Sequence, residues 1–143
     1  MKLSEPIVLD GNLDDPAWEL AAAAAEGFIQ TEPRQGEPAT ERTEVCFLYD
    51  RDYLYIGANC LDSAGASGLV VNDVTRDFDS SNSDYFTVLL DTFDDNRNGF
   101  LFGTNPQGAK RDGQMGGDGA YPNFDWDGVW HVKVRITDSV GIF

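Results

Sequence analysis

Hydrophobic and polar residues alternate along much of the chain, with the period of two that a half-buried β-strand requires. The alternation is most regular from Val129 to Thr137, where Trp130, Val132 and two further aliphatic residues share one face. Together the patterns predict about eight short strands separated by Gly, Asp, Asn and Pro. The other predicted strands include residues 28–30, 43–49, 53–61, 69–71, 84–91 and 99–104.

One segment near the N-terminus breaks the alternation and predicts a helix. Asp14 and Asp15 supply an N-cap, Pro16 suits the first helical position, and Gly27 supplies a stop after the alanine run at 21–25. Short strands with one minor helix predict an all-β fold, a two-sheet β-sandwich of immunoglobulin-like or jelly-roll type with one short helix near the N-terminus. Because no repeat or internal boundary is visible, we expect residues 1–143 to form a single domain.

Two of the strands are expected to form a hairpin that contains both cysteines. A tight turn at residues 50–52 pairs Tyr49 with Tyr53 and places Cys46 opposite Ile56. Cys60 then lies four residues further along its strand, about 13 Å away, which is too far for a disulfide. We therefore predict two separate thiols, both on the face that carries the aliphatic side chains of the hairpin. The same pairing predicts a strip of tyrosines at 49, 53 and 55 on the other face.

The charge of the chain excludes some partners. The 25 Asp and Glu residues against 10 Lys and Arg give a net charge of −15, which repels nucleic acids and anionic membrane surfaces. Solubility, cation binding and a salt-rich habitat would each explain such an excess. No apolar run approaches the ~20 residues that span a bilayer, and we recognise no signal peptide.

Several segments along the chain, taken in order, carry a resemblance to a known family. The first is IVLDGNLDDPAW at residues 7–18. The others are GEPATE at 36–41, LYD at 48–50, LYIG at 54–57, LDTF at 90–93, RNGF at 97–100, NPQG at 105–108 and WDGVW at 126–130. Together they resemble the family 9-like carbohydrate-binding domain of bacterial secreted and envelope proteins, and the resemblance covers nearly the whole chain.

The resemblance implies a non-catalytic, extracellular or periplasmic cell-envelope module of a larger bacterial protein. Its expected partners are a saccharide and the C-terminal region of the parent protein, with no nucleic acid and no membrane insertion by this domain. Domains of this family continue into a last strand, whereas this chain stops at Phe143. We therefore expect a domain truncated before its last strand, with an exposed sheet edge.

Saccharide binding requires flat aromatic faces for the C–H surface of a pyranose and polar groups for its hydroxyls. Trp130 is in phase with an apolar strand face, and Trp18 follows a helix start, so both are expected in the core. Trp126 lies in a glycine-rich loop and is the best candidate for a stacking platform. The alternative is that its side chain closes one end of the core. The predicted carbohydrate-binding residues are Trp126, Tyr121, Phe124, Arg97, Gln107 and Asp112, with Asn105 as a further hydroxyl partner.

The loop at residues 94–99 fits half of a calcium motif. Asp94, Asn96 and Asn98 occupy alternate positions before Gly99, as oxygen ligands of Ca²⁺ do, and Asp84 and Asp91 are acidic neighbours. The final bidentate Glu of such a motif is replaced by Asn105, and a hairpin turn at Asn98–Gly99 explains the same residues. Family 9 modules contain structural calcium, so the resemblance implies Ca²⁺ as a possible cofactor.

Catalysis has little support in the sequence. The single histidine, His131, is expected on the polar face of a strand with Lys133 and Arg135, which makes a catalytic triad improbable. No zinc-ligand spacing or phosphate-binding loop is present. We therefore expect no enzyme. The alternative to saccharide binding is a structural or assembly domain of an envelope protein with no sugar ligand.

Overall fold

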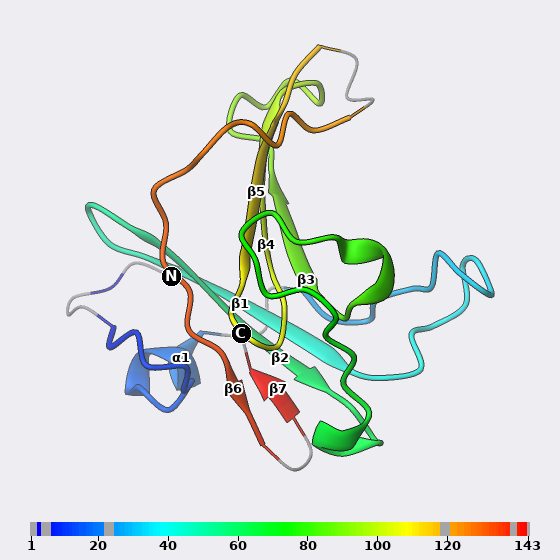
Figure 1. Cartoon of the computed structure of the whole chain (residues 1–143). Coiled ribbons are helices and arrows are strands. Elements are labelled where there is room, and N and C mark those ends of the chain that lie inside the picture. The colour runs from blue at the N-terminus through cyan, green and yellow to red at the C-terminus, as the bar shows by residue number, and fades with distance from the viewer. Residues whose placement is uncertain (1–2, 4–6, 22–24, 118–120, 138–139, 143) are drawn as a thin grey trace. The chain divides into compact units, whose positions relative to one another are not determined.

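The computed structural model describes residues 3, 7–21, 25–117, 121–137 and 140–142, which form two antiparallel β-sheets and one short α-helix (Figure 1). The predicted all-β fold class is confirmed, because the two sheets are those that a sandwich-like fold requires. The chain divides into two compact units. Unit 1 contains Met1–Leu69 and Lys133–Phe143, and unit 2 contains Val70–Val132.

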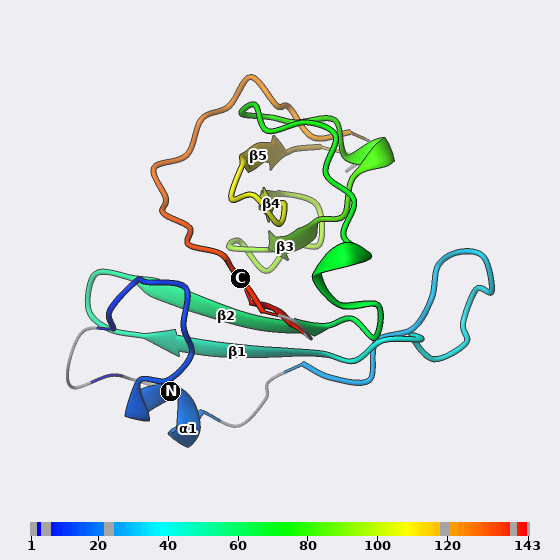
Figure 2. The same ribbon diagram turned by 60° about the horizontal axis from the view of Figure 1, so that its bottom comes forward.

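The sheet of unit 1 is built on a long hairpin. Strands β1 (Thr43–Tyr49) and β2 (Leu54–Leu61) pair along their length and lie side by side in Figure 2. Strand β7 (Val140–Ile142) pairs with the end of β2, and β6 (Arg135–Ile136) pairs with β7, so the order is β1-β2-β7-β6. A 3₁₀ turn, η1 (Gly65–Ser67), follows β2.

The register of this hairpin differs by one residue from the prediction. Tyr49 pairs with Leu54, and Cys46 therefore pairs with Gly57 instead of Ile56. The reason is Asp50, whose Oδ1 accepts hydrogen bonds from the backbone N–H groups of Asp52 and Tyr53 and lengthens the loop to four residues. Both cysteines are free, as expected, but they lie on opposite faces of the sheet.

The helix is shorter than the sequence predicts. Helix α1 spans Pro16–Leu20, and Ala25 already pairs with Val45 in an isolated bridge, so the helix does not continue to Gly27. Asp15 is the N-cap residue, but its side chain makes no capping hydrogen bond. Trp18 is buried, and its ring lies where a side chain at position 57 would project, so Gly57 makes room for it. In the described parts of the chain, no helix has the length and apolarity needed to cross a membrane.

Unit 2 contains a three-stranded antiparallel sheet of order β3-β4-β5. Its strands are β3 (Phe86–Leu90), β4 (Gly99–Thr104) and β5 (Lys110–Met115), and a 3₁₀ turn, η2 (Ser80–Asn82), precedes them. The hairpin predicted between β3 and β4 is confirmed. Strand β5 lies outside the strands that the sequence pattern predicted. It forms because the fully buried Asn105 closes the preceding turn. The side-chain oxygen of Asn105 accepts hydrogen bonds from the backbone N–H groups of Gln107 and Ala109.

The segment expected to be the clearest strand is mostly unpaired with other strands. Of the predicted strand Val129–Thr137, only Arg135 and Ile136 belong to β6. Exposure nevertheless alternates from residue 122 to residue 134, with Trp130 and Val132 half-buried and His131 exposed. The sequence pattern therefore identified the two faces correctly and the sheet pairing incorrectly. Residues 28–30 contribute an isolated bridge, Ile29 to Pro38, and residues 69–71 form no strand.

Candidate functional site

One face of the sheet in unit 2 carries aromatic side chains on its central strand. In β4, Phe100 and Phe102 are two residues apart and therefore point to the same face. Their cross-strand partners on β5 are Gln114 and Asp112, so this face of the sheet changes from aromatic on β4 to polar on β5.

Two tryptophans from the segment after β5 extend this aromatic surface. Trp126 lies 4.9 Å from Phe100 and 6.0 Å from Phe102 between ring centroids, and Trp130 lies 5.5 Å from Phe102. Phe93, in the loop after β3, lies 6.4 Å from Phe100. We call these five residues the aromatic row. Trp126 and Trp130, for which the sequence predicted opposite roles, are both half-buried members of this row.

The exposed end of the row is held by the acidic loop between β3 and β4. The carboxylate of Asp91 accepts hydrogen bonds from the backbone N–H groups of Phe93, Asp95 and Asn96, at 3.2, 3.3 and 2.8 Å. Phe93 itself is 63% exposed. The loop therefore orders the backbone under an aromatic side chain that faces solvent. The sequence analysis did not single out Phe93. The signal that could have identified it is its position in a predicted hairpin loop, two residues after the turn-forming Asp91.

A second carboxylate, that of Asp95, closes the same loop. It accepts hydrogen bonds from the N–H groups of Arg97 and Asn98 at 2.8 Å each, and from the side-chain amide of Asn98. The backbone N–H of Asn98, followed by its side-chain amide, lowers the pKa of Asp95 below its usual value. Asp94 and Asn96 have positive φ angles of 54° and 55°, which Asp and Asn tolerate better than most residues.

Of the predicted calcium ligands, Asp84 lies apart from Asp91, and Asp91 and Asn98 already accept hydrogen bonds from backbone N–H groups. Asp91 already accepts three backbone N–H groups, and Asn98 accepts the N–H of Gly117. Asp84 accepts the N–H of Val70 before β3 begins, seven residues from Asp91 and about 20 Å away along the strand. Within the described residues, no group of three or more His, Cys, Asp or Glu side chains is placed to hold a metal ion. The loop geometry favours the hairpin-turn interpretation.

Removing calcium tests the two interpretations of this loop. Because the carboxylates of Asp91 and Asp95 already accept backbone N–H groups, we expect the melting temperature to be the same in excess chelator and in millimolar Ca²⁺. A bound ion would instead stabilise the fold by about 2.7 kcal/mol at a hundredfold excess over its dissociation constant. A fall of several degrees on chelation, reversed by Ca²⁺, would restore the metal site.

The predicted saccharide contacts lie in several different places. Arg97 is in the loop before β4 and Gln107 is in the turn after it, so they lie at opposite ends of that strand. Phe124 packs beside Gly113, on the face opposite the aromatic row, and the guanidinium carbon of Arg111 lies 4.1 Å from its ring centroid. Tyr121 is 89% exposed and makes no described ring contact.

Asp112, another predicted saccharide contact, is fully buried and accepts structural hydrogen bonds. Its Oδ1 lies 2.6 Å from Nη2 of Arg76, and its Oδ2 accepts the backbone N–H of Gly128. Arg76 also pairs with Asp127, with 2.7 Å between Nε and Oδ1. Sequence reasoning missed this network, because Arg76 and Asp112 are 36 residues apart and no local pattern connects them.

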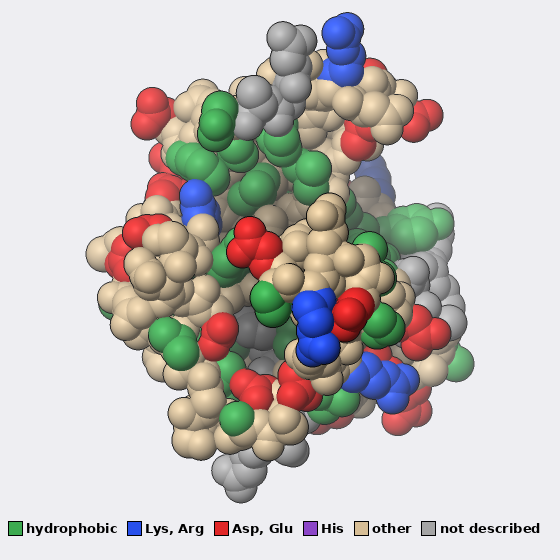
Figure 3. Space-filling view, turned by 90° about the vertical axis from the view of Figure 1, so that its right-hand side faces the viewer, with side chains coloured by type: hydrophobic (Ala, Val, Ile, Leu, Met, Phe, Trp, Pro, Cys, Tyr) green, Lys and Arg blue, Asp and Glu red, His purple; other side chains and the backbone are tan. Residues whose placement is uncertain are grey.

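On the face seen in Figure 3, described acidic side chains lie among neutral and hydrophobic ones. This distribution fits the solubility explanation of the acidic excess.

Comparisons with protein-family models, curated proteins and solved structures find no match to this chain. The resemblance to the family 9-like carbohydrate-binding domain therefore remains a prediction from its sequence segments. The described side chains and their geometry are the remaining basis for a functional proposal.

Proposed function

We propose that this chain is a non-catalytic binding module that holds a saccharide against the exposed end of the aromatic row. The observation that supports this proposal is the group Phe93, Phe100 and Trp126. Phe93 is 63% exposed, and successive ring centroids are 6.4 and 4.9 Å apart. The ring planes are tilted by 40° and 37°, so together they form a curved apolar surface suited to the C–H face of a pyranose.

A polar group stands beside these rings. Gln114 pairs with Phe100 across the sheet, is exposed, and has no side-chain hydrogen-bond partner among the described residues. Its amide can donate to one hydroxyl group and accept from another. With a net charge of −15 the chain repels acidic glycans, so the proposed ligand is a neutral saccharide. The sequence resemblance also supports an extracellular or cell-envelope location.

A structural or assembly domain is the second candidate. Trp126 is half-buried between Phe100 and Phe102 and is in the same phase as Trp130. A continuous row of this kind is also what the core of unit 2 requires. In that case Phe93 would be the exposed end of a core and would bind no ligand.

A glycan-array screen followed by titration tests the saccharide proposal. The array is probed with the full chain, with and without Ca²⁺, and the selected neutral glycan is titrated while tryptophan fluorescence is followed. Stacking on one ring contributes about 0.5–1.5 kcal/mol beyond area burial, so Phe93→Ala should weaken binding by about two- to tenfold. Trp126→Ala should abolish detectable binding.

Phe28→Ala is the matched control, because Phe28 is 41% exposed and lies in unit 1. It should leave the affinity unchanged. If the array retains no glycan, or if a retained glycan binds Phe93→Ala and Trp126→Ala as tightly as the unmodified chain, the saccharide proposal is wrong and the structural role is favoured.

A further inference from the structure

The loop between β3 and β4 ends in an asparagine–glycine pair, Asn98–Gly99. In such a pair the backbone nitrogen of glycine can attack the side-chain amide carbon of asparagine, because glycine has no Cβ atom to hinder the approach. Asn98 is half-buried, and Gly99 is buried at the start of β4. No other Asn–Gly pair occurs in the sequence. The chain therefore has one position at which spontaneous deamidation is chemically favoured.

The β3–β4 hairpin requires glycine at position 99. A Cβ atom there would lie 2.8 Å from the carbonyl oxygen of Leu90 on β3, which is closer than Cβ atoms approach in proteins. Gly99 also pairs with Met115 of β5, so it lies between two neighbouring strands. The fold thus demands the residue that makes Asn98 reactive. Protection from the reaction has to come from the groups that hold the Asn98 side chain.

Hydrogen bonds hold the Asn98 side chain at both ends of its amide. Nδ2 donates to Oδ2 of Asp95 at 2.6 Å, and Oδ1 accepts the backbone N–H of Gly117 at 3.3 Å. Oδ1 of Asp95 also accepts the backbone N–H of Asn98 at 2.8 Å. Deamidation expels Nδ2 as ammonia, so this nitrogen must first leave Asp95. The Asp95 carboxylate therefore opposes the reaction directly.

We propose that Asn98 is a deamidation site that the Asp95 carboxylate keeps closed in the folded chain. Hydroxide takes the amide proton of Gly99, whose nitrogen then bonds to Cγ of Asn98. The Cγ–Nδ2 bond breaks, and the NH₂ group leaves as ammonia with a proton from water, which restores hydroxide. Water then opens the cyclic imide. Opening at Cγ gives aspartate, and opening at the backbone carbonyl gives isoaspartate, in which the chain runs through Cγ.

The product reverses the interaction that opposed its formation. Both products carry a carboxylate at position 98, which is ionised at neutral pH. The 2.6 Å hydrogen bond between Asn98 and Asp95 is then replaced by two carboxylates, which repel each other at such a distance. Isoaspartate also adds a backbone carbon next to Gly99. The modification is thus a one-way change from a closed to an open loop, whether or not a saccharide binds nearby.

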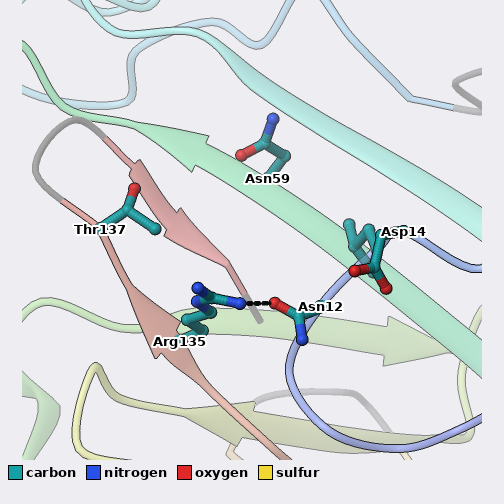
Figure 4. A pocket seen from close by; sticks show the side chains of 6 residues that line it. Asn12, Asp14, Asn59, Arg135 and Thr137 are labelled. Atoms are coloured by element: carbon teal, nitrogen blue, oxygen red, sulfur yellow. Dashed lines mark hydrogen bonds between the residues drawn. The ribbon is translucent and has the colours of Figure 1, made fainter.

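Asn12 of unit 1 is held in the same manner and provides an internal control. Its backbone N–H and its Nδ2 donate to Asp10 at 2.8 and 2.9 Å, and its Oδ1 accepts a hydrogen bond from Arg135 (Figure 4). The next residue is Leu13, however, whose side chain hinders attack by its own backbone nitrogen. Asn12 should therefore convert far more slowly than Asn98 even when the chain is unfolded.

Peptide mapping by mass spectrometry measures the reaction. The full chain is incubated at neutral pH, folded in buffer and unfolded in urea, and the aspartyl and isoaspartyl peptides of position 98 are separated and quantified. Asn98 should convert about tenfold or more slowly in the folded chain, because the reaction then requires a local opening of the loop. Equal rates in the two states would overturn the proposal. So would faster conversion of Asn12 than of Asn98 in urea.

Asp95→Asn and Asp94→Asn form a matched pair, because each removes one negative charge from the same loop. Asp95→Asn keeps an oxygen for the backbone N–H groups of Arg97 and Asn98 and replaces only the acceptor of Asn98 Nδ2 by a donor. Asp94 has a φ of 54°, which asparagine tolerates, and its side chain makes no hydrogen bond to a described residue.

Each variant is incubated below its own melting temperature. Asp95→Asn should raise the conversion rate of Asn98 in the folded chain by about fivefold or more, since the loop opens more often, and should leave the rate in urea unchanged. Asp94→Asn should leave both rates unchanged. The proposal is wrong if Asp95→Asn reacts like the unmodified chain, or if Asp94→Asn accelerates the reaction equally.

Asn98→Asp tests the effect of the product directly. It should lower the melting temperature and speed hydrogen–deuterium exchange of the backbone amides at residues 93–98, because the two carboxylates repel each other. Asn12→Asp, which places a carboxylate beside Asp10 but also beside Arg135, should leave exchange in this loop unchanged. If Asn98→Asp melts and exchanges like the unmodified chain, deamidation does not open the loop.

Discussion

Truncating Phe78 to alanine is expected to lower the free energy of unfolding by about 4 kcal/mol, because it removes a fully buried aromatic side chain. Phe78 has 0% exposure and packs edge-on against Tyr85, with 6.5 Å between ring centroids. Its loss removes the transfer free energy of the ring and leaves a cavity. Urea denaturation followed by circular dichroism measures the change.

The control is the same truncation at an exposed position of the same unit. Phe93→Ala removes an identical ring that is 63% exposed, so we expect a loss of about 1 kcal/mol or less. If the two variants lost similar stability, the assignment of Phe78 to the core would be wrong. This pair also shows whether Phe93→Ala is folded, which the saccharide titration requires.

Replacing Asp112 by alanine should lower the free energy of unfolding by about 3 kcal/mol. The carboxylate is fully buried, and its loss leaves the Arg76 guanidinium without its closest partner and the Gly128 N–H without an acceptor. Breaking a buried ion pair by removing one member costs about 3–5 kcal/mol. We expect the lower end, since the Arg76 side chain is 38% exposed and keeps Asp127.

Asp127→Ala is a closely matched control, because Asp127 pairs with the same guanidinium at nearly the same distance. Its side chain is 71% exposed, and exposed ion pairs contribute about 0–1 kcal/mol. The comparison therefore isolates burial from pairing. Equal losses for the two variants would mean that Asp112 is not the structural centre of this network.

The strand pattern predicted β3 and β4, but it failed at residues 129–134, which alternate most regularly and pair with no strand, and at β5. Strands β3 and β4 lie within the predicted ranges, because large apolar residues recur at every second position, at 86, 88 and 90 in β3 and at 100 and 102 in β4. Strand β5, with the sequence KRDGQM, has no apolar alternation and lies outside the predicted strands. Its pairing depends on β4 and on the buried turn at Asn105, and neither is visible within β5 itself.

The hairpin of unit 1 shows how a small error in the loop changes every face assignment. Adding one residue to the predicted turn moves Tyr55 to the face opposite Tyr49 and separates Cys46 from Cys60. The predicted strip of tyrosines therefore does not form as one strip. The side chain of Asp50 causes the change, and its preference for the N–H groups of Asp52 and Tyr53 is a local property that sequence reasoning can include.

The candidate sites were predicted less completely than the fold. Trp126 was predicted to be a stacking platform from its place in a glycine-rich loop, but its ring neighbour Phe100 lies 26 positions away in the sequence, and Phe93, which contacts Phe100, lies 33 positions away. In unit 1, the row that joins β2 to β6 runs through β7, and the N-terminal segment approaches Val134 at Gly11. Contacts of this kind follow from topology, which periodicity alone does not supply.

The segment at residues 122–134 is attached to β5 by backbone hydrogen bonds at one position and by side chains at two others. Gln114 and Asn123 exchange two backbone hydrogen bonds, Asp112 accepts a hydrogen bond from the N–H of Gly128, and Lys110 Nζ donates one to the Trp130 carbonyl. In the described part of this segment, the backbone N–H groups of Asn123, Asp125 and Gly128 donate hydrogen bonds. The other amides should exchange with deuterium through small local fluctuations, whereas those of β4 require the sheet to open. Two tryptophans of the aromatic row would thus remain packed while the backbone that carries them exchanges early.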